Sequence, residues 1–159
     1  QGPLMMLYED MDKFNLDIVG GLYWTKGNPS MPLIYGDPKE TREKAAGMFK
    51  VRFPAKVQKK RRVGKLNDDG SDWTDGEVVL CNGSGMGFNL FKMDIFRNPK
   101  LEKPFFKTIS DHGTDAKPGI RMYTQDLQGM ERMRELGYKI AIDTRIKIGH
   151  LDVRTNIIY

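Results

Sequence analysis

Three groups of residues have the chemistry that a functional site needs. Asp126, preceded by Gln125, stands at the predicted start of a helix, where its carboxylate can accept a proton from a hydroxyl group as a general base. His150 follows a predicted strand and is one of only two histidines, so its imidazole is a candidate metal ligand. Glycines at 83, 85 and 87 flank Met86 between a strand and a helix, where a bare backbone can approach a ligand closely.

Each of these three groups can also be explained by a purely structural role. The sequence leaves both the functional and the structural explanation open. An acid in the first turn of a helix complements the helix dipole, a lone histidine is often structural, and glycines form turns. The G-x-G-x-G spacing of residues 83–87 differs from the G-x-G-x-x-G of dinucleotide-binding loops, and no alternating βαβ pattern surrounds it. A Rossmann-type site is therefore not favoured.

Two further groups are interpreted as inert. Cys81 has no histidine near it in the sequence, so we expect a buried, unreactive thiol. His112 lies beside Asp111 and Asp115, but this spacing matches no compact metal motif and indicates only a polar loop.

The elements that must position these residues alternate between helix and strand. Apolar residues at helical spacing predict a helix over 4–14, and a run of apolar residues predicts a buried strand over 17–24. Thr124 as N-cap and Gly137 as the residue after the last turn delimit a helix over 124–136, whose buried stripe is Leu127, Met130, Met133 and Leu136.

The remaining elements are shorter. Strands are expected at 31–35, 77–81, 138–142 and 146–148, with turns at 82–87 and 143–145. A helical turn is expected at 40–47, an extended segment at 48–53, a short helix within 88–96 and a lid-like loop at 109–120. These elements predict a mixed α/β fold, in which one sheet is covered by two or three helices.

The length of 159 residues suits one domain. Residues 1–3 resemble the remnant of an expression tag, so we assign 4–159 to a single α/β domain. The net charge of +5 is concentrated in a basic loop or hairpin inserted at about 54–76, which holds Lys56, Lys59, Lys60, Arg61, Arg62 and Lys65. This run is either a solvated loop or a phosphate-binding surface, and its lack of interleaved aromatic residues argues against single-stranded nucleic acid.

Composition also bears on location. No stretch is long and apolar enough to cross a bilayer, and the N-terminus lacks the pattern of a signal peptide. A single cysteine excludes an internal disulfide framework. We therefore expect a soluble, cytoplasmic domain.

An ordered set of segments resembles bacterial and phage glycosyltransferases of the GT-A fold. Residues 17–24 and 32–35 resemble one segment of these enzymes. Residues 81–88, followed by the basic Lys92 and Ile95-Phe96, are similar to a segment that forms part of their sugar pocket. The closing motifs of the family resemble residues 124–127, 136–139 and 143–150.

This resemblance implies transfer of a sugar from a nucleotide-sugar donor to an acceptor hydroxyl, with Mn²⁺ or Mg²⁺ neutralising the donor diphosphate. Asp126 matches the position of the base, or of the residue that orients the acceptor, and His150 matches the histidine that completes the metal shell. The substrate-binding positions would be Tyr23, Trp24, Gly85, Met86, Gly87 and Gln125.

The resemblance covers the C-terminal, acceptor-side part of the fold. The nucleotide-binding half, with its strand-end Asp-x-Asp, is expected ahead of residue 1, so this chain alone should have little activity. Asp10-Met11-Asp12 fits the Asp-x-Asp pattern, but it lies at the end of a predicted helix and not of a strand. We therefore interpret it as a chance match. Gln125 stands where the family usually has an acid.

Two other classes of function remain open. A non-catalytic domain could bind a glycan or a partner, or form a homo-oligomer through an exposed strand edge. A basic module built on residues 56–65 would bind nucleic acid with a steep salt dependence.

Overall fold

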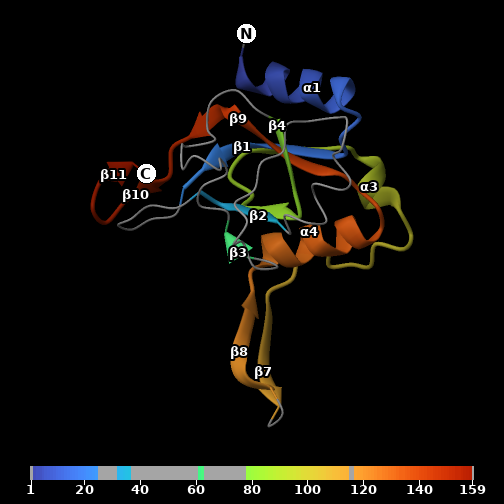
Figure 1. Cartoon of the computed structure of the whole chain (residues 1–159), viewed down its shortest axis with the longest axis vertical. Coiled ribbons are helices and arrows are strands. Elements are labelled where there is room, and N and C mark those ends of the chain that lie inside the picture. The colour runs from blue at the N-terminus through green and yellow to red at the C-terminus, as the bar shows by residue number, and fades with distance from the viewer. Residues whose placement is uncertain (1, 25–31, 37–60, 63–77, 115–116, 159) are drawn as a thin grey trace, which may run out of the picture.

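A computed structural model describes residues 2–24, 32–36, 61–62, 78–114 and 117–158 and shows a mixed α/β fold. The main sheet has four strands in the order β4 (Val78–Cys81), β9 (Ile140–Ile148), β1 (Ile18–Tyr23) and β6 (Asn89–Phe91). The central pair, β1 and β9, is parallel, and both outer strands run antiparallel to their neighbours (Figure 1). The prediction of a mixed sheet flanked by helices is confirmed at this level.

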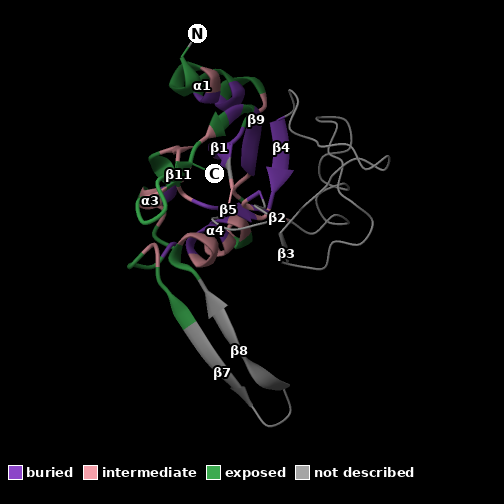
Figure 2. Ribbon diagram, turned by 90° about the vertical axis from the view of Figure 1, so that its left-hand side faces the viewer, coloured by how far each residue is buried: buried purple, intermediate pink, exposed green. Residues whose placement is uncertain are grey.

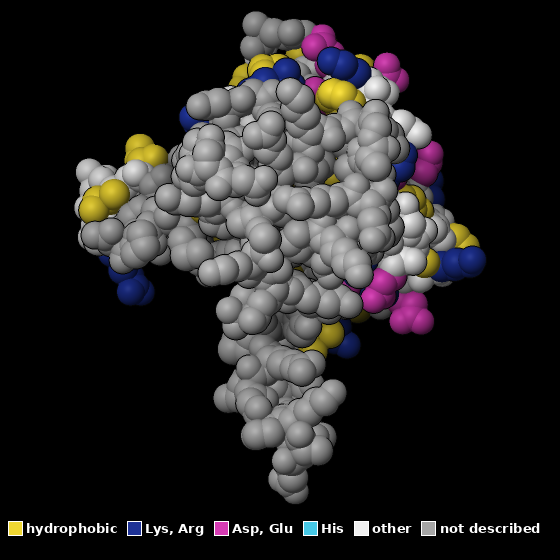
Figure 3. Space-filling model, viewed as in Figure 1, with side chains coloured by type: hydrophobic (Ala, Val, Ile, Leu, Met, Phe, Trp, Pro, Cys, Tyr) yellow, Lys and Arg dark blue, Asp and Glu magenta, His cyan; other side chains and the backbone are white. Residues whose placement is uncertain are grey.

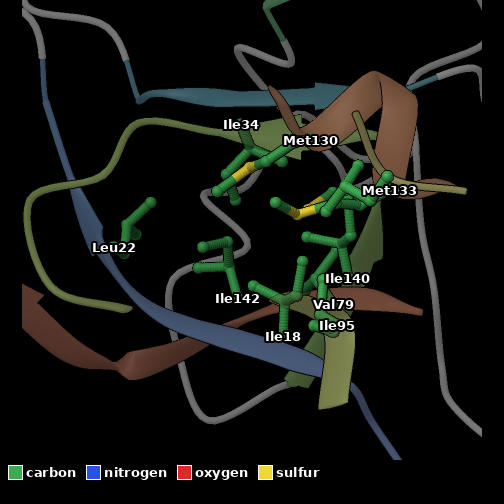
Figure 4. Close-up of a cluster of buried hydrophobic side chains, with 11 residues drawn as sticks. Ile18, Leu22, Ile34, Val79, Ile95, Met130, Met133, Ile140 and Ile142 are labelled. Atoms are coloured by element: carbon green, nitrogen blue, oxygen red, sulfur yellow. The ribbon is translucent and has the colours of Figure 1, made fainter. Parts of the chain in front are cut away.

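Two helices cover opposite faces of this sheet (Figure 2). Side chains alternate along the strands, so that one face packs on α1 (Pro3–Lys13) and the other on α4 (Gln125–Glu135). Val19 and Ala141 pack with Leu7 and Met11 of α1. The opposite cluster contains Ile18, Ile34, Ile140, Ile142, Met130 and Met133 (Figure 4).

Both long helices were expected from apolar periodicity, and both are confirmed. In α1, Leu7 and Met11 lie one turn apart and are buried. In α4, Met130 and Met133 are buried, and Gly137 follows the helix with φ of +92°, a conformation that glycine adopts without strain. Thr124 is the N-cap residue, although its side chain makes no hydrogen bond to the backbone.

The predicted turn at 143–145 is wrong, because β9 is one continuous strand of nine residues. Gly21 pairs with Asp143, whereas the next residue, Leu22, pairs with Lys147. The three residues between these partners form a bulge instead of reversing the chain. The two short strands expected around this turn are therefore parts of one.

The short helix expected within 88–96 is present, although it begins late and ends one residue beyond this segment, whereas the strand before it was not expected. Residues 89–91 form β6, which pairs with residues 18–20 of β1, and only the later part is helical, as α3 (Asp94–Arg97). The partner strand lies some seventy positions away, so local sequence carried no sign of this pairing.

The lid-like loop expected at 109–120 is also a wrong prediction. The chain forms a hairpin of β7 (Ile109–Thr114) and β8 (Lys117–Tyr123), which extends away from the sheet and helices (Figures 1 and 2). Strand β8 leads directly into Thr124 and α4. The base of the hairpin is therefore adjacent to the start of α4.

Two small sheets complete the described chain. Strands β2 (Ile34–Gly36), β3 (Arg61–Arg62) and β5 (Gly83–Ser84) form one of them, with β2 in the middle. The strand expected at 31–35 is therefore shorter than predicted, since it begins only at Ile34, and it ends one residue later than predicted, at Gly36. The helical turn at 40–47, the segment 48–53 and all of the basic insert except Arg61 and Arg62 lie outside the described residues.

Strands β10 (Leu151–Asp152) and β11 (Ile157–Ile158) form the other small sheet. It exposes Leu151, Val153, Ile157 and Ile158, and apolar side chains are visible in this region at the left of Figure 3. None of the described helices is both long and apolar enough to span a membrane.

Candidate functional site

The glycine segment 83–87 lies against α4 rather than forming a simple turn. Its first two residues are β5, paired with Ile34 and Tyr35 of β2, and the Gly85 N–H donates to the Leu33 carbonyl at 3.3 Å. Gly85 is buried, Met86 is half-buried and Gly87 is exposed. Of these three predicted substrate contacts, Met86 and Gly87 are therefore the accessible ones.

The side chain of Asn89 holds this segment in place. Its amide nitrogen donates to the Gly85 and Phe88 carbonyls at 3.1 Å, and its amide oxygen accepts from the Ser84 hydroxyl at 3.3 Å. The Ser84 N–H in turn donates to the Met130 sulfur of α4 at 3.1 Å. Asn89 was not predicted as a site residue, because its side chain reaches the glycine segment only in the folded protein.

Asp126 lies in the first turn of α4, on the side that faces the sheet. It precedes Met130 by one helical turn and Met133 by two, and these two methionines are fully buried. The Asp126 carboxylate is half-buried and accepts hydrogen bonds from the Thr124 hydroxyl and from the Leu127 N–H. It therefore lies one turn beyond the last buried residue of this stripe, with its carboxylate bonded to the start of its own helix.

Contacts of neighbouring residues support this placement. A Cβ atom on Gly83 would lie 3.1 Å from Leu127 and 3.9 Å from Met130, so the first half of α4 passes directly over the segment. Gln125, the other predicted residue of this turn, is exposed. The structure therefore brings Asp126 and Gln125 to the same region as residues 83–87.

Trp24 and His150 form a second pair of predicted residues. Trp24 follows β1, is half-buried and packs against the cluster under α4. His150 follows β9, and its Nδ1 lies 3.2 Å from the Trp24 carbonyl oxygen. Tyr23 is the last residue of β1 and pairs with Ile148. The parallel pairing of β1 and β9 thus brings Tyr23, Trp24 and His150 to one end of the sheet.

The same end of the sheet also receives the start of α4. Met130 lies beside Ile34 and Ile142, whereas the later Met133 lies toward Ile140 (Figure 4). Helix α4 therefore runs opposite to β9, and its N-terminus points toward the end at which β9 stops. Asp126 and His150 approach this end from α4 and from β9, respectively; a shared cleft between their side chains remains a prediction.

Lys92 does not belong to this group. It follows β6 and bonds to Asp17, with Nζ 3.2 Å from the carboxylate, at the opposite end of β1. Asp17 also accepts from the Lys139 N–H at 2.9 Å, so this ion pair ties together the start of β1, the end of β6 and the start of β9. Its role in the described chain is structural.

A divalent cation needs more ligands than the described residues provide. Among them, no group of three His, Cys, Asp or Glu residues is placed to hold a metal ion. If His150 Nδ1 donates to the Trp24 carbonyl, the ring nitrogen with a lone pair is Nε2, the arrangement common in metal-binding histidines. The nearby Asp152 accepts from the Arg154 N–H at 2.9 Å. His150 is therefore at most a single candidate ligand, and we derive no chemical step through a metal.

Two other features lie outside the predicted site. A hollow of about 610 Å³ is lined by residues on both sides of Leu101, including Phe96, Lys103 and Phe105, and by no predicted site residue. Cys81 is buried as expected, and this burial raises its pKa to about 12. Neither feature contributes to the end of the sheet where Asp126 and His150 lie.

Sequence reasoning also missed a cluster of Asp10, Asp143 and Arg145 under α1. Asp10 is 4% exposed and Asp143 is fully buried, and both accept hydrogen bonds from Arg145. The interpretation of Asp10-Met11-Asp12 as part of a helix is confirmed, since α1 extends to Lys13. The sequence did contain a sign of this cluster. Asp10 lies three residues after Leu7 and next to Met11, on the apolar face of the helix, and a carboxylate buried there needs a hydrogen-bonding or charged partner.

Comparison of this chain with family models, curated proteins and solved structures gave no match in any of the three.

Proposed function

We propose that this chain supplies the acceptor-binding side of a nucleotide-sugar-dependent glycosyltransferase of the GT-A type. The observation that carries the proposal is the position of Asp126, half-buried at the start of α4, on the stripe that faces the sheet and beside Leu127, which lies against Gly83. A carboxylate held in this way can accept the proton of a sugar hydroxyl or other alcohol as the oxygen attacks the donor.

The surrounding residues suit the binding of a hydroxyl-rich acceptor. Met86 and Trp24 offer partly buried apolar surface, while the exposed Gln125 and the backbone at Gly87 offer hydrogen-bonding groups. The N-terminus of α4 adds backbone N–H donors and a positive dipole end to this surface.

In the proposed reaction, His150 and Mn²⁺ or Mg²⁺ would serve the donor. The metal, when bound, neutralises the diphosphate that leaves with the nucleotide. Since the described residues offer one nitrogen ligand, the remaining ligands would come from the donor itself and from other parts of the protein. The proposal for this chain therefore concentrates on acceptor binding and on Asp126.

Acceptor binding can be tested directly by NMR. A library of saccharides and simple alcohols would be titrated into the 15N-labelled chain, and we expect saturable shifts of the Gly87, Gln125 and Asp126 amides. Gly2, exposed at the start of α1, is the internal control and should not respond. An absence of shifts with every acceptor, or shifts spread evenly over the surface, would contradict the proposal.

The donor side is tested by calorimetry with nucleotide sugars and Mn²⁺. We expect this chain alone to show no tight, saturable binding of the donor. Tight binding would show that the donor site lies within these residues, and would change the assignment from an acceptor side to a complete enzyme.

A further inference from the structure

A cluster of two buried aspartates and one partly exposed arginine joins α1 to β9. The Arg145 Nη2 donates to both oxygens of Asp10, at 2.8 and 2.7 Å. The Nε and Nη2 atoms of Arg145 donate to the two oxygens of Asp143, each at 2.8 Å, and the Arg145 N–H adds a bond to the same carboxylate at 2.9 Å. One guanidinium is therefore shared by two carboxyl groups from different elements.

The charges of this cluster do not balance when both carboxyl groups are ionised. Asp10 is 4% exposed and Asp143 is 0% exposed, so neither carboxylate is solvated by bulk water. The guanidinium keeps its single positive charge over the whole accessible pH range, which leaves one excess negative charge. Two carboxyl groups that share a buried site disfavour the second ionisation, and a proton between them removes the excess.

The contact lies within an apolar interface. Leu7 and Met11 flank Asp10 on α1 and cover the sheet together with Leu16. Beneath them lie the apolar side chains of three strands, namely Val19, Val78, Leu80, Ala141 and Ile146. The cluster is thus the polar part of the contact that keeps α1 on this face.

Within the described part of α1 and β9, the other charged groups near the cluster are at the surface. The described side chains that β1 and β4 place against α1 are uncharged. The remaining charged residues of α1 and of β9 are exposed, and these are Glu9, Asp12, Lys13 and Lys147. The Arg145 side chain is 40% exposed, which gives protons a route to the buried carboxyl groups.

We propose that Asp10, Asp143 and Arg145 form a binding site for one proton, and that occupation of this site regulates how firmly α1 is held on the sheet. With the proton bound, Asp10 donates a hydrogen bond to the Asp143 carboxylate and the cluster is neutral. Without it, repulsion between two buried carboxylates weakens the contact between α1 and β9. Release of α1 would uncover the apolar face of the sheet.

The expected direction follows from the acidity of Asp10. Burial, and then its hydrogen bond with Asp143, raise the pKa of Asp10 from 3.8 to about 6, although Arg145 acts in the opposite direction. A group that holds its proton more tightly in the docked state stabilises that state at low pH. This stabilisation is complete below about pH 4 and is lost as the pH rises through about 6.

The first test follows the proton itself in the whole chain. Carboxyl 13C shifts of aspartate side chains would be recorded between pH 3 and pH 8. We expect Asp10 to titrate near pH 6. A midpoint for Asp10 at or below pH 4 would overturn the proposal.

The second test follows α1. Hydrogen exchange of its amides, corrected for the intrinsic pH dependence, gives the equilibrium constant for helix release. We expect this constant to rise by up to roughly tenfold per pH unit between about pH 4 and 6, and to level off above pH 7. A constant that does not change with pH would overturn the proposal.

Two variants separate this site from general charge effects. Asp10→Asn replaces the carboxyl group by a neutral amide and should make helix release independent of pH. Asp12→Asn removes a carboxylate from the exposed side of the same helix and should leave the pH dependence intact. Equal behaviour of the two variants would contradict the proposal, and if Asp10→Asn fails to fold, the wild-type titration decides.

Discussion

The amide of Asn89 lies directly over Gly20, so close that a Cβ atom at this glycine would be 2.8 Å from it. Gly20 is paired with Asn89 in the register of β1 and β6. Because the same amide bonds to Gly85, Phe88 and Ser84, the missing side chain at position 20 is what allows the glycine segment to be held against the sheet.

Gly20→Ala should therefore destabilise the protein. The methyl group displaces Asn89, and its partners at Gly85 and Ser84 lose their hydrogen bonds. We expect a loss of roughly 1–3 kcal/mol in the free energy of unfolding, measured by urea denaturation. Gly2→Ala is the matched control, since a Cβ atom there meets nothing within 4 Å. Equal stability of the two variants would show that Asn89 relaxes without loss.

Asp126→Asn should lower turnover in any active form of the protein by a factor of roughly 10²–10⁴, the usual contribution of a general base. The amide keeps the size of the side chain but cannot accept the proton. Asp94→Asn is the control, because Asp94 is an exposed carboxylate of α3 paired with Arg97. If Asp126 only complements the helix dipole, stability will fall by up to about 1 kcal/mol while turnover stays near normal.

His150→Ala should mainly weaken metal-dependent donor binding. The imidazole is held against the Trp24 carbonyl, so its loss removes a positioned nitrogen ligand but leaves the acceptor side intact. The measurement is the Mn²⁺ concentration that gives half-maximal turnover, which we expect to rise while acceptor affinity is unchanged. Thr155→Ala, in the exposed turn after β10, is the control. An unchanged Mn²⁺ requirement would indicate a structural histidine.

The Cys81 thiol should be unreactive in the folded protein. Burial raises its pKa to about 12, so almost no thiolate is present at neutral pH, and the side chain is 5% exposed. We expect a disulfide reagent to label Cys81 only at the rate of unfolding in buffer, and fast in urea. Fast labelling in buffer would mean that β4 leaves the sheet locally.

The isolated chain should self-associate. The described sheet ends in the outer strands β4 and β6, and β10–β11 exposes Val153 and Ile158 to 82% and 71%. Exposed apolar strands favour pairing with another chain. Sedimentation equilibrium should detect a dimer or larger species, and Val153→Lys should reduce its population. A well-behaved monomer at high concentration would refute this.

Local patterns predicted those elements whose side chains repeat with the period of the structure. The stripe of Met130 and Met133 and the apolar run at Ile18 and Val19 identified α4 and β1. The same patterns placed Asp126 at a helix start. By contrast, β6 and the uninterrupted β9 depend on partners far along the chain, and the hairpin β7–β8 lies in a segment rich in glycine and polar residues.

The side chains that escaped prediction, at the candidate site and in the separate cluster under α1, are those whose partners come together only in the fold. Asn89 acquires its role only when β6 pairs with β1, and Arg145 meets Asp10 across 135 positions of sequence. In the sequence, Asp10 looked like the first residue of an Asp-x-Asp motif. In the structure its side chain is buried and pairs with Arg145. No spacing rule connects two such residues before the fold is known.

The parallel pairing of β1 with β9 also determines when the sheet can form during synthesis. Asp17 and Lys139, which bond where these strands begin, are 122 positions apart. A ribosome that adds about 5–20 residues per second synthesises β9 roughly 6 to 24 seconds after β1. During that interval β1 lacks its central neighbour, and its apolar side chains have no completed sheet to join. We therefore expect the four-stranded sheet to be completed only after the end of β9 has emerged from the ribosome.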